Sequence, residues 1–317
     1  MRFRDMERAD RGAVLDLLEH AFGIRDLFER YMDFDPEFAY GDVLLALEGD
    51  APVACVQVFQ KTIRLAGQPV RLGGIGSVAT RASQRGSGLA TELLERALER
   101  MRARELSLSL LFAAPVAPLY ERLGWRRIPA PLLRLTRARV GEPPDPGRDF
   151  QPADLARVSA LYDVFTAALS GPTLRDARYW RGQLRTAGTP TETFRLAHSV
   201  GELAAYARSA NFNGRQRVIE YARSPEGAES LADLLASSIP PDKPTYAPFT
   251  NDPGLARALE ARGVSLALAA DPSPMWKVLD TARLARIAGL PGSASDQDLL
   301  HSLIERPRAT YFPSDRF

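Results

Sequence analysis

The residues best placed to do chemistry lie in a short glycine loop, residues 85–90. Arg85 supplies a cation, and Gly86 and Gly88 let the main chain approach a ligand without a Cβ atom in the way. An apolar run precedes the loop, and an amphipathic helix begins at its end. A helix begins with unpaired N–H groups and a partial positive charge. The sequence therefore predicts an anion site suited to a diphosphate.

Other phosphate-binding patterns fit this loop poorly. It lacks the Gly-Lys-Ser/Thr sequence of a Walker loop, and it has two glycines where the dinucleotide fingerprint needs three. Two glycines before a helix are also compatible with an ordinary turn. The identity of the anion must therefore come from the surrounding elements.

Few reactive side chains lie elsewhere in the chain. Cys55, the single cysteine, stands in an alternating apolar run, which is typical of a small buried hydrophobe. The histidines His20, His198 and His301 lie far apart in the sequence and lack metal-ligand spacing. We therefore expect neither an intramolecular disulfide nor a bound metal.

The composition narrows the class of protein. The 317 residues include 41 basic and 39 acidic side chains, a formal net charge of +2, so no nucleic-acid partner is expected. Hydrophobic residues make up 45% and charged residues 25%, as in soluble globular proteins. No run approaches the ~20 apolar residues of a membrane span, and the N-terminus has no signal-peptide core. A cytoplasmic protein without a membrane partner is the expectation.

The elements that position the loop alternate between helices and strands, which predicts an α/β (α+β) fold with a mixed sheet. In chain order they are a helix at 10–22 with Asp10 as N-cap and Gly23 as stop, an aromatic-rich segment at 24–40, strands at 42–47, 53–65 and 70–80, a helix at 88–104, an apolar strand at 106–113, a short helix at 118–123 and closing strands through residue 135.

The order of elements restarts after a Pro/Gly-rich linker, residues 141–147. Residues 45–56 resemble residues 196–207, and residues 121–125 resemble residues 260–264. We interpret this as a diverged internal duplication, with chance similarity of two mixed α/β domains as the alternative. The predicted organisation is a first domain at 1–140, the linker at 141–147, a second domain at 148–280 and a C-terminal extension at 281–317.

Residues 80–94 closely resemble the acetyl-CoA loop of GNAT-superfamily N-acetyltransferases. Arg85, Gly88 and Ala90 match the family pattern Arg/Gln-x-x-Gly-x-Gly/Ala, and residues 118–125 resemble its Tyr-x-x-x-Gly-Phe segment, with tryptophan replacing phenylalanine. The resemblance implies tandem GNAT folds and acetyl-CoA as co-substrate, without a metal. It assigns the cofactor to Val78, Ala79, Thr80, Arg85, Gly86, Ser87, Gly88, Leu89, Ala90 and Thr91.

The corresponding loop of the second half is residues 223–228. It lacks the paired glycines, and Pro225 and Glu226 oppose anion binding. We therefore predict a degenerate second GNAT domain, with acetyl-CoA bound once per chain.

A duplicated GNAT fold with a C-terminal appendix resembles the enhanced-intracellular-survival (Eis) acetyltransferases, which have an active first domain, a degenerate second and a sterol-carrier-like third. Residues 274–280 are similar to the join into that third domain, but only a short extension follows. The resemblance implies that Tyr120 protonates the departing CoA thiolate. It also implies that the terminal carboxylate, here that of Phe317, takes the proton of the amine. The aromatic tail at 311–317 favours a docked chain end; a disordered tail without a catalytic role is the alternative.

These features predict an N-acetyltransferase that moves an acetyl group from acetyl-CoA to a primary amine by direct transfer in a ternary complex. The acceptor is a small-molecule or protein amine, and the Eis resemblance implies polyamine, aminoglycoside or lysine amines. A non-catalytic CoA-binding or regulatory module, and a tandem-GNAT transferase with another acyl donor, stay open. Such enzymes often assemble, so a homo-oligomer is also an open expectation. One group of acidic residues could line the acceptor pocket or form a solvated face: Asp26, Glu29, Asp33, Asp35 and Glu37.

Overall fold

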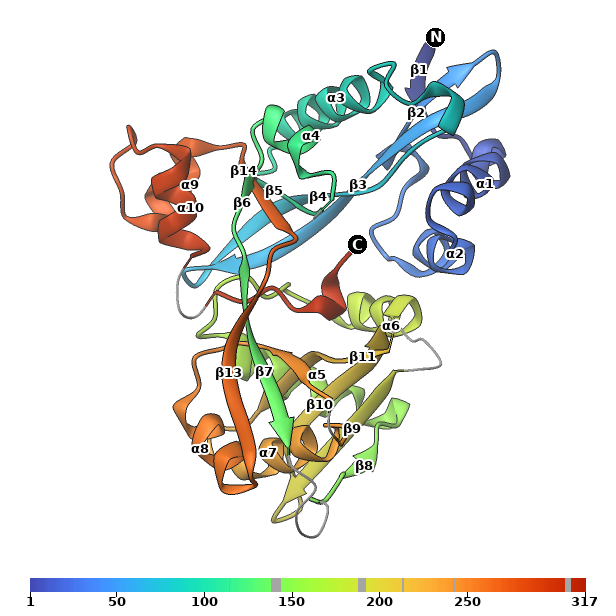
Figure 1. The fold of residues 1–317 in the computed structure, drawn as a ribbon. Coiled ribbons are helices and arrows are strands. Elements are labelled where there is room, and N and C mark those ends of the chain that lie inside the picture. The colour runs from blue at the N-terminus through green and yellow to red at the C-terminus, as the bar shows by residue number, and fades with distance from the viewer. Residues whose placement is uncertain (114, 138–143, 188–191, 213, 242, 306–308) are drawn as a thin grey trace.

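A computed structural model describes residues 1–113, 115–137, 144–187, 192–212, 214–241, 243–305 and 309–317. The chain forms two sheets, one above the other in Figure 1, and the C-terminal end lies between them. The predicted linker lies partly outside the described residues. Its residues 144–147 have no regular secondary structure and lead into β8 (Arg148–Asp149).

The first sheet carries the glycine loop at the end of β4. Its strand order is β1-β2-β3-β4-β5-β14-β6, and its neighbours pair antiparallel except β4 and β5, which are parallel. Parallel neighbours need a crossover connection, which α3 (Leu89–Ala103) provides. The strands are β1 (Arg2–Asp5), β2 (Val43–Glu48), β3 (Ala51–Leu65), β4 (Gln68–Thr80), β5 (Leu108–Phe112), β6 (Arg126–Arg127) and β14 (Pro274–Val278).

Helices cover both faces of this sheet because alternate side chains of each strand point to opposite faces. On β2, Leu44 packs with α3, whereas Leu45 packs with α1 (Arg11–Phe22) and α2 (Arg25–Phe34). The stripe of α3 that faces the sheet is apolar at helical spacing, as predicted, and it consists of Leu93, Leu94, Ala97, Leu98 and Met101.

The sequence predicted the C-terminal end of α1 correctly but not the cap at its N-terminal end. Gly23 ends the helix with φ 71°, the left-handed conformation expected of a glycine stop. Asp10 precedes the helix but does not cap it with its side chain. Its carboxylate accepts instead from the Glu7 N–H at 2.7 Å and from the Arg4 guanidinium at 2.6 Å.

The second sheet repeats this arrangement, in the order β13-β7-β12-β11-β10-β9-β8. The β10–β11 hairpin, α7 (Ala228–Ser237) and the parallel strand β12 follow one another as β3–β4, α3 and β5 do. The predicted fold class, two mixed α/β sheets of one type, is confirmed. The remaining strands and helices are β7 (Ala130–Arg137), β9 (Thr193–Ser199), β10 (Glu202–Phe212), β11 (Arg215–Arg223), β12 (Thr245–Pro248), β13 (Val264–Asp271), α4 (Ala117–Arg122), α5 (Leu155–Thr166), α6 (Ala177–Ala187) and α8 (Pro253–Ala261).

Each sheet takes one strand from the other half of the chain. β7 pairs with β12 and β13 of the second sheet, with Leu133 opposite both Ala247 and Leu268. β14 returns to the first sheet, where Trp276 lies opposite Leu110 of β5. The predicted domain limits stay a prediction, but neither sheet is built from one continuous segment.

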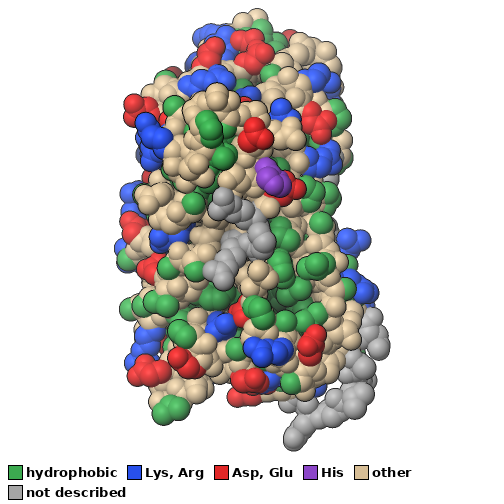
Figure 2. All heavy atoms as spheres, turned by 90° about the vertical axis from the view of Figure 1, so that its left-hand side faces the viewer, with side chains coloured by type: hydrophobic (Ala, Val, Ile, Leu, Met, Phe, Trp, Pro, Cys, Tyr) green, Lys and Arg blue, Asp and Glu red, His purple; other side chains and the backbone are tan. Residues whose placement is uncertain are grey.

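The C-terminal extension begins with α9 (Thr281–Ala288) and α10 (Asp296–Leu303). They pack on apolar side chains of the first sheet that include Ile63, Leu72 and Trp276. On the face that carries these two helices, charges of both signs are spread, and hydrophobic side chains gather in its lower half (Figure 2). No described helix is long and apolar enough to cross a membrane.

Main-chain hydrogen bonds tie the second half of the chain to the first sheet and to the tail. The Leu174 N–H donates to the Thr62 carbonyl at 2.8 Å, and the Gly171 N–H donates to the Arg64 carbonyl at 2.6 Å, so residues 171–174 run beside β3. The Thr310 N–H donates to the Ser170 carbonyl at 2.7 Å. The segment 170–174 therefore lies between the first sheet and the tail.

Candidate active site

The glycine loop opens α3, as the sequence predicts. Gly86 and Gly88 have φ of 79° and 86°, and a Cβ atom at either would meet no atom within 4 Å. The left-handed conformation, rather than crowding, therefore requires these glycines. Gly88 is the N-cap, and no side chain caps the helix; the Ser87 hydroxyl donates away from it, to the Gln84 carbonyl at 2.5 Å. The first amides of α3 are left for an anion.

Arg85 is exposed beside these amides. Its Nε donates weakly to the Thr80 carbonyl at 3.4 Å, and no described carboxylate lies within ion-pair distance of it. Leu89 is buried in the core below, while Ala90 and Thr91 are half-buried in the first turn. The predicted loop residues thus form one surface with a cation and uncompensated helix amides.

β4 separates from β5 before it reaches this loop. The two strands pair at Leu72, Gly73 and Gly74, and in the part of the chain that the structure describes no pairing between them continues past Gly74. β4 nevertheless runs on to Thr80, held on its other edge by β3. A gap therefore opens along Val78, Ala79 and Thr80, the strand segment among the residues predicted to bind acetyl-CoA.

A bulge in β4 sets the direction of this segment. Ser77 has φ 52°, unusual for a residue with a side chain, and the register with β3 shifts there. The Ser77 hydroxyl donates to Gln57 Oε1 at 3.1 Å, and the Cys55 thiol donates to the Ser77 carbonyl at 3.2 Å. Cys55 is buried, as predicted, and burial raises its thiol pKa to about 12.

Tyr120 lies on α4 in the core that α3 covers, and it is 5% exposed. Its ring meets the Trp125 ring edge-on at 6.1 Å, and the Trp125 indole N–H donates to Ser109 Oγ at 3.2 Å, which anchors the pair to β5. Among the described residues the Tyr120 hydroxyl has no hydrogen-bond partner. Burial raises its pKa to about 12, so the phenol keeps its proton at neutral pH.

Phe317 docks on β4 at the place where β4 leaves β5. Its ring stacks on Phe59 at 5.2 Å, and a Cβ atom at Gly74 would stand 2.2 Å from that ring. A Cβ atom at Gly76 would stand 3.3 Å from the Phe317 carbonyl carbon. The glycines of β4 therefore make room for the last residue.

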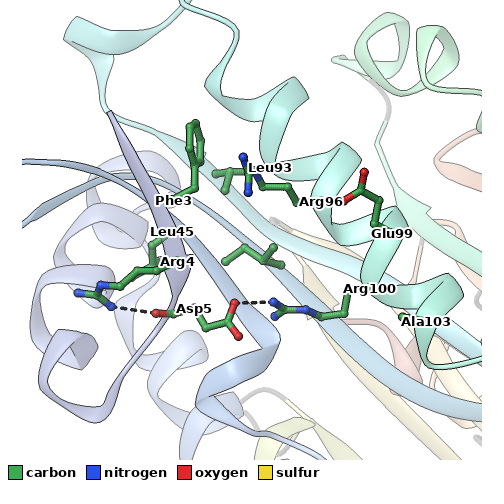
Figure 3. A pocket seen from close by; sticks show the side chains of 10 residues that line it. Phe3, Arg4, Asp5, Leu45, Leu93, Arg96, Glu99, Arg100 and Ala103 are labelled. Atoms are coloured by element: carbon green, nitrogen blue, oxygen red, sulfur yellow. Dashed lines mark hydrogen bonds and ion pairs between the residues drawn. The ribbon is translucent and has the colours of Figure 1, made fainter.

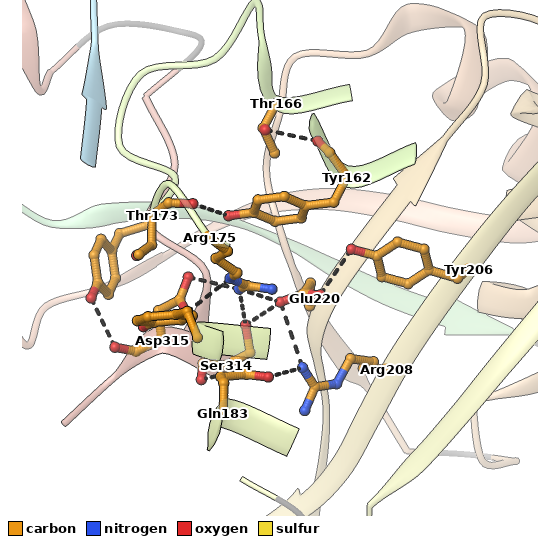
Figure 4. A network of polar contacts seen from close by, with 12 residues as sticks. Tyr162, Thr166, Thr173, Arg175, Gln183, Tyr206, Arg208, Glu220, Ser314 and Asp315 are labelled. Carbon is orange, nitrogen blue, oxygen red and sulfur yellow. Dashed lines mark hydrogen bonds and ion pairs between the residues drawn. The ribbon is translucent and has the colours of Figure 1, made fainter. Parts of the chain in front are cut away.

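A buried network holds the residues just before Phe317 (Figure 4). Arg175 bonds the carboxylates of both Glu220 and Asp315, and all three side chains are fully buried. No local pattern indicates this cluster, because its members lie far apart along the chain.

The expected acidic wall is largely neutralised. Asp35 pairs with Lys61 at 3.0 Å, and both side chains are nearly buried. Asp33 pairs with Arg11 at 2.8 Å, and Glu29 pairs with Arg25 at 2.9 Å. Asp26 and Glu37 have no ion pair among the described residues. We conclude that this segment is not the strongly acidic surface that its composition suggests.

Two hollows lie on the Phe317 side of β3. A narrow one of about 20 Å³ contacts Tyr31, Lys61, Tyr179 and Phe317. A larger one of about 650 Å³ shares Lys61 and Tyr179 with it and opens to solvent. A separate hollow of about 420 Å³, between β1 and α3, contains none of the predicted site residues (Figure 3).

Comparison with known proteins agrees with this geometry. Residues 2–128 match the model of an acetyltransferase (GNAT) domain family. No curated protein sequence matches the chain. Among solved structures, the chain resembles a GCN5-related N-acetyltransferase from Kribbella flavida, with TM-score 0.67, 19% identity and coverage of 89% of this chain and 73% of that one.

Two further structures have the same fold. A GCN5-related N-acetyltransferase from Anabaena variabilis matches with TM-score 0.69 and 14% identity, covering 89% of this chain and 74% of that one. Eis1 from Mycobacterium abscessus matches with TM-score 0.64 and 17% identity, covering 90% of this chain and 75% of that one. The chain therefore contains an acetyltransferase domain of the GNAT family at residues 2–128, followed by a second fold of the same type.

Proposed function

We propose that this protein is an acetyl-CoA-dependent N-acetyltransferase that moves an acetyl group directly to a primary amine in a ternary complex. The observation that carries the proposal is the gap along Val78–Thr80, which runs from the docked Phe317 to the uncapped start of α3. A diphosphate suits the α3 amides and Arg85. An extended arm suits the unpaired edge of β4, as an added strand would.

Main-chain groups of β4 would orient the thioester. We propose that an N–H near Val78 or Thr80 donates to its carbonyl oxygen and stabilises the negative charge that develops during attack. Burial of the neighbouring Ala79 lowers the local dielectric constant, which strengthens such a donor.

Tyr120 is proposed to protonate the departing thiolate. A phenol with pKa about 12 is a weak acid toward a thiol of ordinary pKa near ~8.5. However, burial raises the pKa of a thiol as well, and Cys55 in this same sheet reaches about 12. Tyr120 shares an apolar cluster with Val78 of the gap. A thiolate formed among such apolar groups would be destabilised by the same cause, so the two pKa values would approach each other and the transfer would cost little.

The carboxylate of Phe317 is proposed to take the proton of the attacking amine. Its main chain lies against Gly76, on the edge of the gap, and the hollows lined by Lys61 and Tyr179 give an acceptor access from the other side. Because the charges in these hollows are paired, they do not narrow the acceptor beyond a primary amine, on either a small molecule or a protein. The cytoplasmic location and a homo-oligomer stay predictions.

The test is thiol release from acetyl-CoA with a panel of primary amines: a polyamine, an aminoglycoside and a lysine peptide. Calorimetry with acetyl-CoA and myristoyl-CoA runs in parallel. We expect amine-dependent thiol release and one acetyl-CoA bound per chain. Binding without thiol release for any amine would instead identify a CoA-binding module, and turnover only with the long-chain donor would identify a different acyltransferase.

A further inference from the structure

The end of the chain is held by ion pairs that the proposed chemistry does not itself use. Asp315 stands two residues before Phe317, in a 3₁₀ helix (Pro313–Asp315). Its carboxylate accepts from Arg175 Nε at 3.2 Å and Nη2 at 2.7 Å, and from the Tyr179 hydroxyl at 3.0 Å. Three donors on one carboxylate fix both its position and its direction.

Arg175 is itself fixed by the second fold. Its guanidinium lies over the rings of Tyr162 and Trp180, at 4.2 and 4.3 Å from their centres. Its Nη2 also donates to Glu220 Oε2 at 2.5 Å, and Glu220 Oε1 accepts from the Tyr206 hydroxyl at 2.8 Å. Burying three charges is costly, and the ion pairs and hydrogen bonds among Arg175, Glu220 and Asp315 offset that cost. An apolar contact could hold a tail in place, but it would not fix the tail's direction.

The contacts beyond Asp315 continue toward the gap. The Tyr311 hydroxyl donates to the Asp315 carbonyl at 2.8 Å, and the Tyr31 hydroxyl donates to the Arg316 carbonyl at 3.3 Å. Arg316 pairs with Asp271 at 2.5 Å. Two residues span at most about 7 Å, so a shift of Asp315 passes to the chain end with little slack.

We propose that Arg175 is a positioning residue, which clamps Asp315 and thereby sets the Phe317 carboxylate beside Gly76 for proton transfer. This inference rests on the proposed function, in which that carboxylate is the base. It adds that the second fold takes part in the reaction of the first, through a side chain that is fully buried.

The main variant is Asp315→Asn, which keeps the shape of the side chain but weakens its attraction to Arg175. A base displaced by about 1 Å lowers kcat about 10- to 100-fold, whereas the dissociation constant for acetyl-CoA stays within twofold. The loss should shrink as pH rises, because the acceptor amine then loses its proton to solvent and needs the base less. A merely less stable protein would instead lose activity by the same factor at every pH.

The matched control is Asp252→Asn. Asp252 makes a similar two-bond pair with Arg223, at 2.7 and 3.0 Å, elsewhere in the second fold, and an asparagine can still cap α8. We expect it to keep kcat within twofold. Arg175→Lys is the second variant, since it keeps the charge but loses the planar fork, and the same pH-dependent loss is expected.

Extending the chain by Gly-Ser after Phe317 separates this inference from the proposed base. The extension removes the carboxylate from its place and leaves Arg175 untouched. Full activity of the extended protein would overturn the base and the clamp together. The clamp alone would be overturned if the extended protein is inactive while Asp315→Asn and Arg175→Lys both keep wild-type kcat at every pH.

Discussion

The contact between Gly74 and Phe317 gives the sharpest test of the docked chain end. In Gly74→Ala the new Cβ atom would stand 2.2, 2.4 and 2.6 Å from three atoms of the Phe317 ring. Carbon atoms pack at about 3.5–4.0 Å, so the ring must move by more than ~1 Å. The stack on Phe59 and the adjacent carboxylate move with it. Misplacement of this size lowers kcat about 100-fold if the carboxylate is the base.

Gly73→Ala is a matched control on the neighbouring residue of the same strand. There the Cβ atom faces α3, where it would stand 2.7 Å from Met101 Sδ and 3.0 Å from a Leu106 methyl. Both contacts are the ends of adaptable side chains, so the overpacking costs about 1–3 kcal/mol in the free energy of unfolding without moving the tail. We expect both variants to lower the melting temperature, but only Gly74→Ala to lower kcat strongly.

The assay measures kcat, the dissociation constant for acetyl-CoA and the melting temperature for both variants. A third protein combines Gly74→Ala with Phe317→Ala, which removes the ring but keeps the terminal carboxylate. If the clash causes the loss, the double variant recovers part of kcat. Equal losses of kcat in Gly73→Ala and Gly74→Ala, in proportion to their stability, would refute the docking argument.

Three other predictions follow from individual residues. Tyr120→Phe should lower kcat about 100-fold, as expected for a lost proton donor, whereas the affinity for acetyl-CoA measured by calorimetry should not change. The control is Tyr221→Phe, which removes a buried hydroxyl of the second fold and should keep kcat. Gly88→Ala forces a side chain into φ 86°, which costs about 1–2 kcal/mol, and should weaken acetyl-CoA binding, whereas Gly263→Ala, at φ 69°, should lose stability alone. Pairing with buried arginines lowers the pKa of Glu220 to about 2, below the ~4.3 of an unfolded chain. The stabilisation by Glu220 is therefore complete above pH ~4.3 and is lost as the pH falls toward 2. Acid unfolding of Glu220→Gln, followed by circular dichroism, should show a weaker pH dependence than that of the wild type, and an unchanged profile would contradict this prediction.

Local features of the site could be predicted from the sequence because local rules decide them. Gly86 and Gly88 adopt the left-handed conformation that marks a turn into a helix, and the apolar stripe of α3 fixes where that helix lies. Long-range pairings could not be predicted. Lys61 neutralises Asp35 from 26 residues away, and Asp315 is held by a side chain 140 residues earlier. Charge patterns along the chain do not reveal such partners, so the sequence left open whether the acidic residues at 26–37 form a pocket wall or a solvated face.

The exchange of strands also lies beyond sequence periodicity. β7 and β14 read as ordinary strands, and nothing in their alternation states which sheet they join. The pairing of Leu133 with Leu268, and of Trp276 with Leu110, places each strand inside the sheet of the other half, between two of its strands. The restart of the element order therefore predicted two folds correctly, without predicting that each is completed by the other.

The loop before α7 differs from the glycine loop before α3. In this loop Arg223 donates to the Ser224 and Pro225 carbonyls, and a Cβ atom at Gly227 would stand 2.2 Å from the Ala204 carbonyl oxygen. That acetyl-CoA binds once per chain stays a prediction. The same fold nevertheless supplies the clamp on the tail and one strand of the first sheet. We infer that the second fold contributes to catalysis by holding the chain end, and disrupting its core should therefore lower kcat before it affects acetyl-CoA binding.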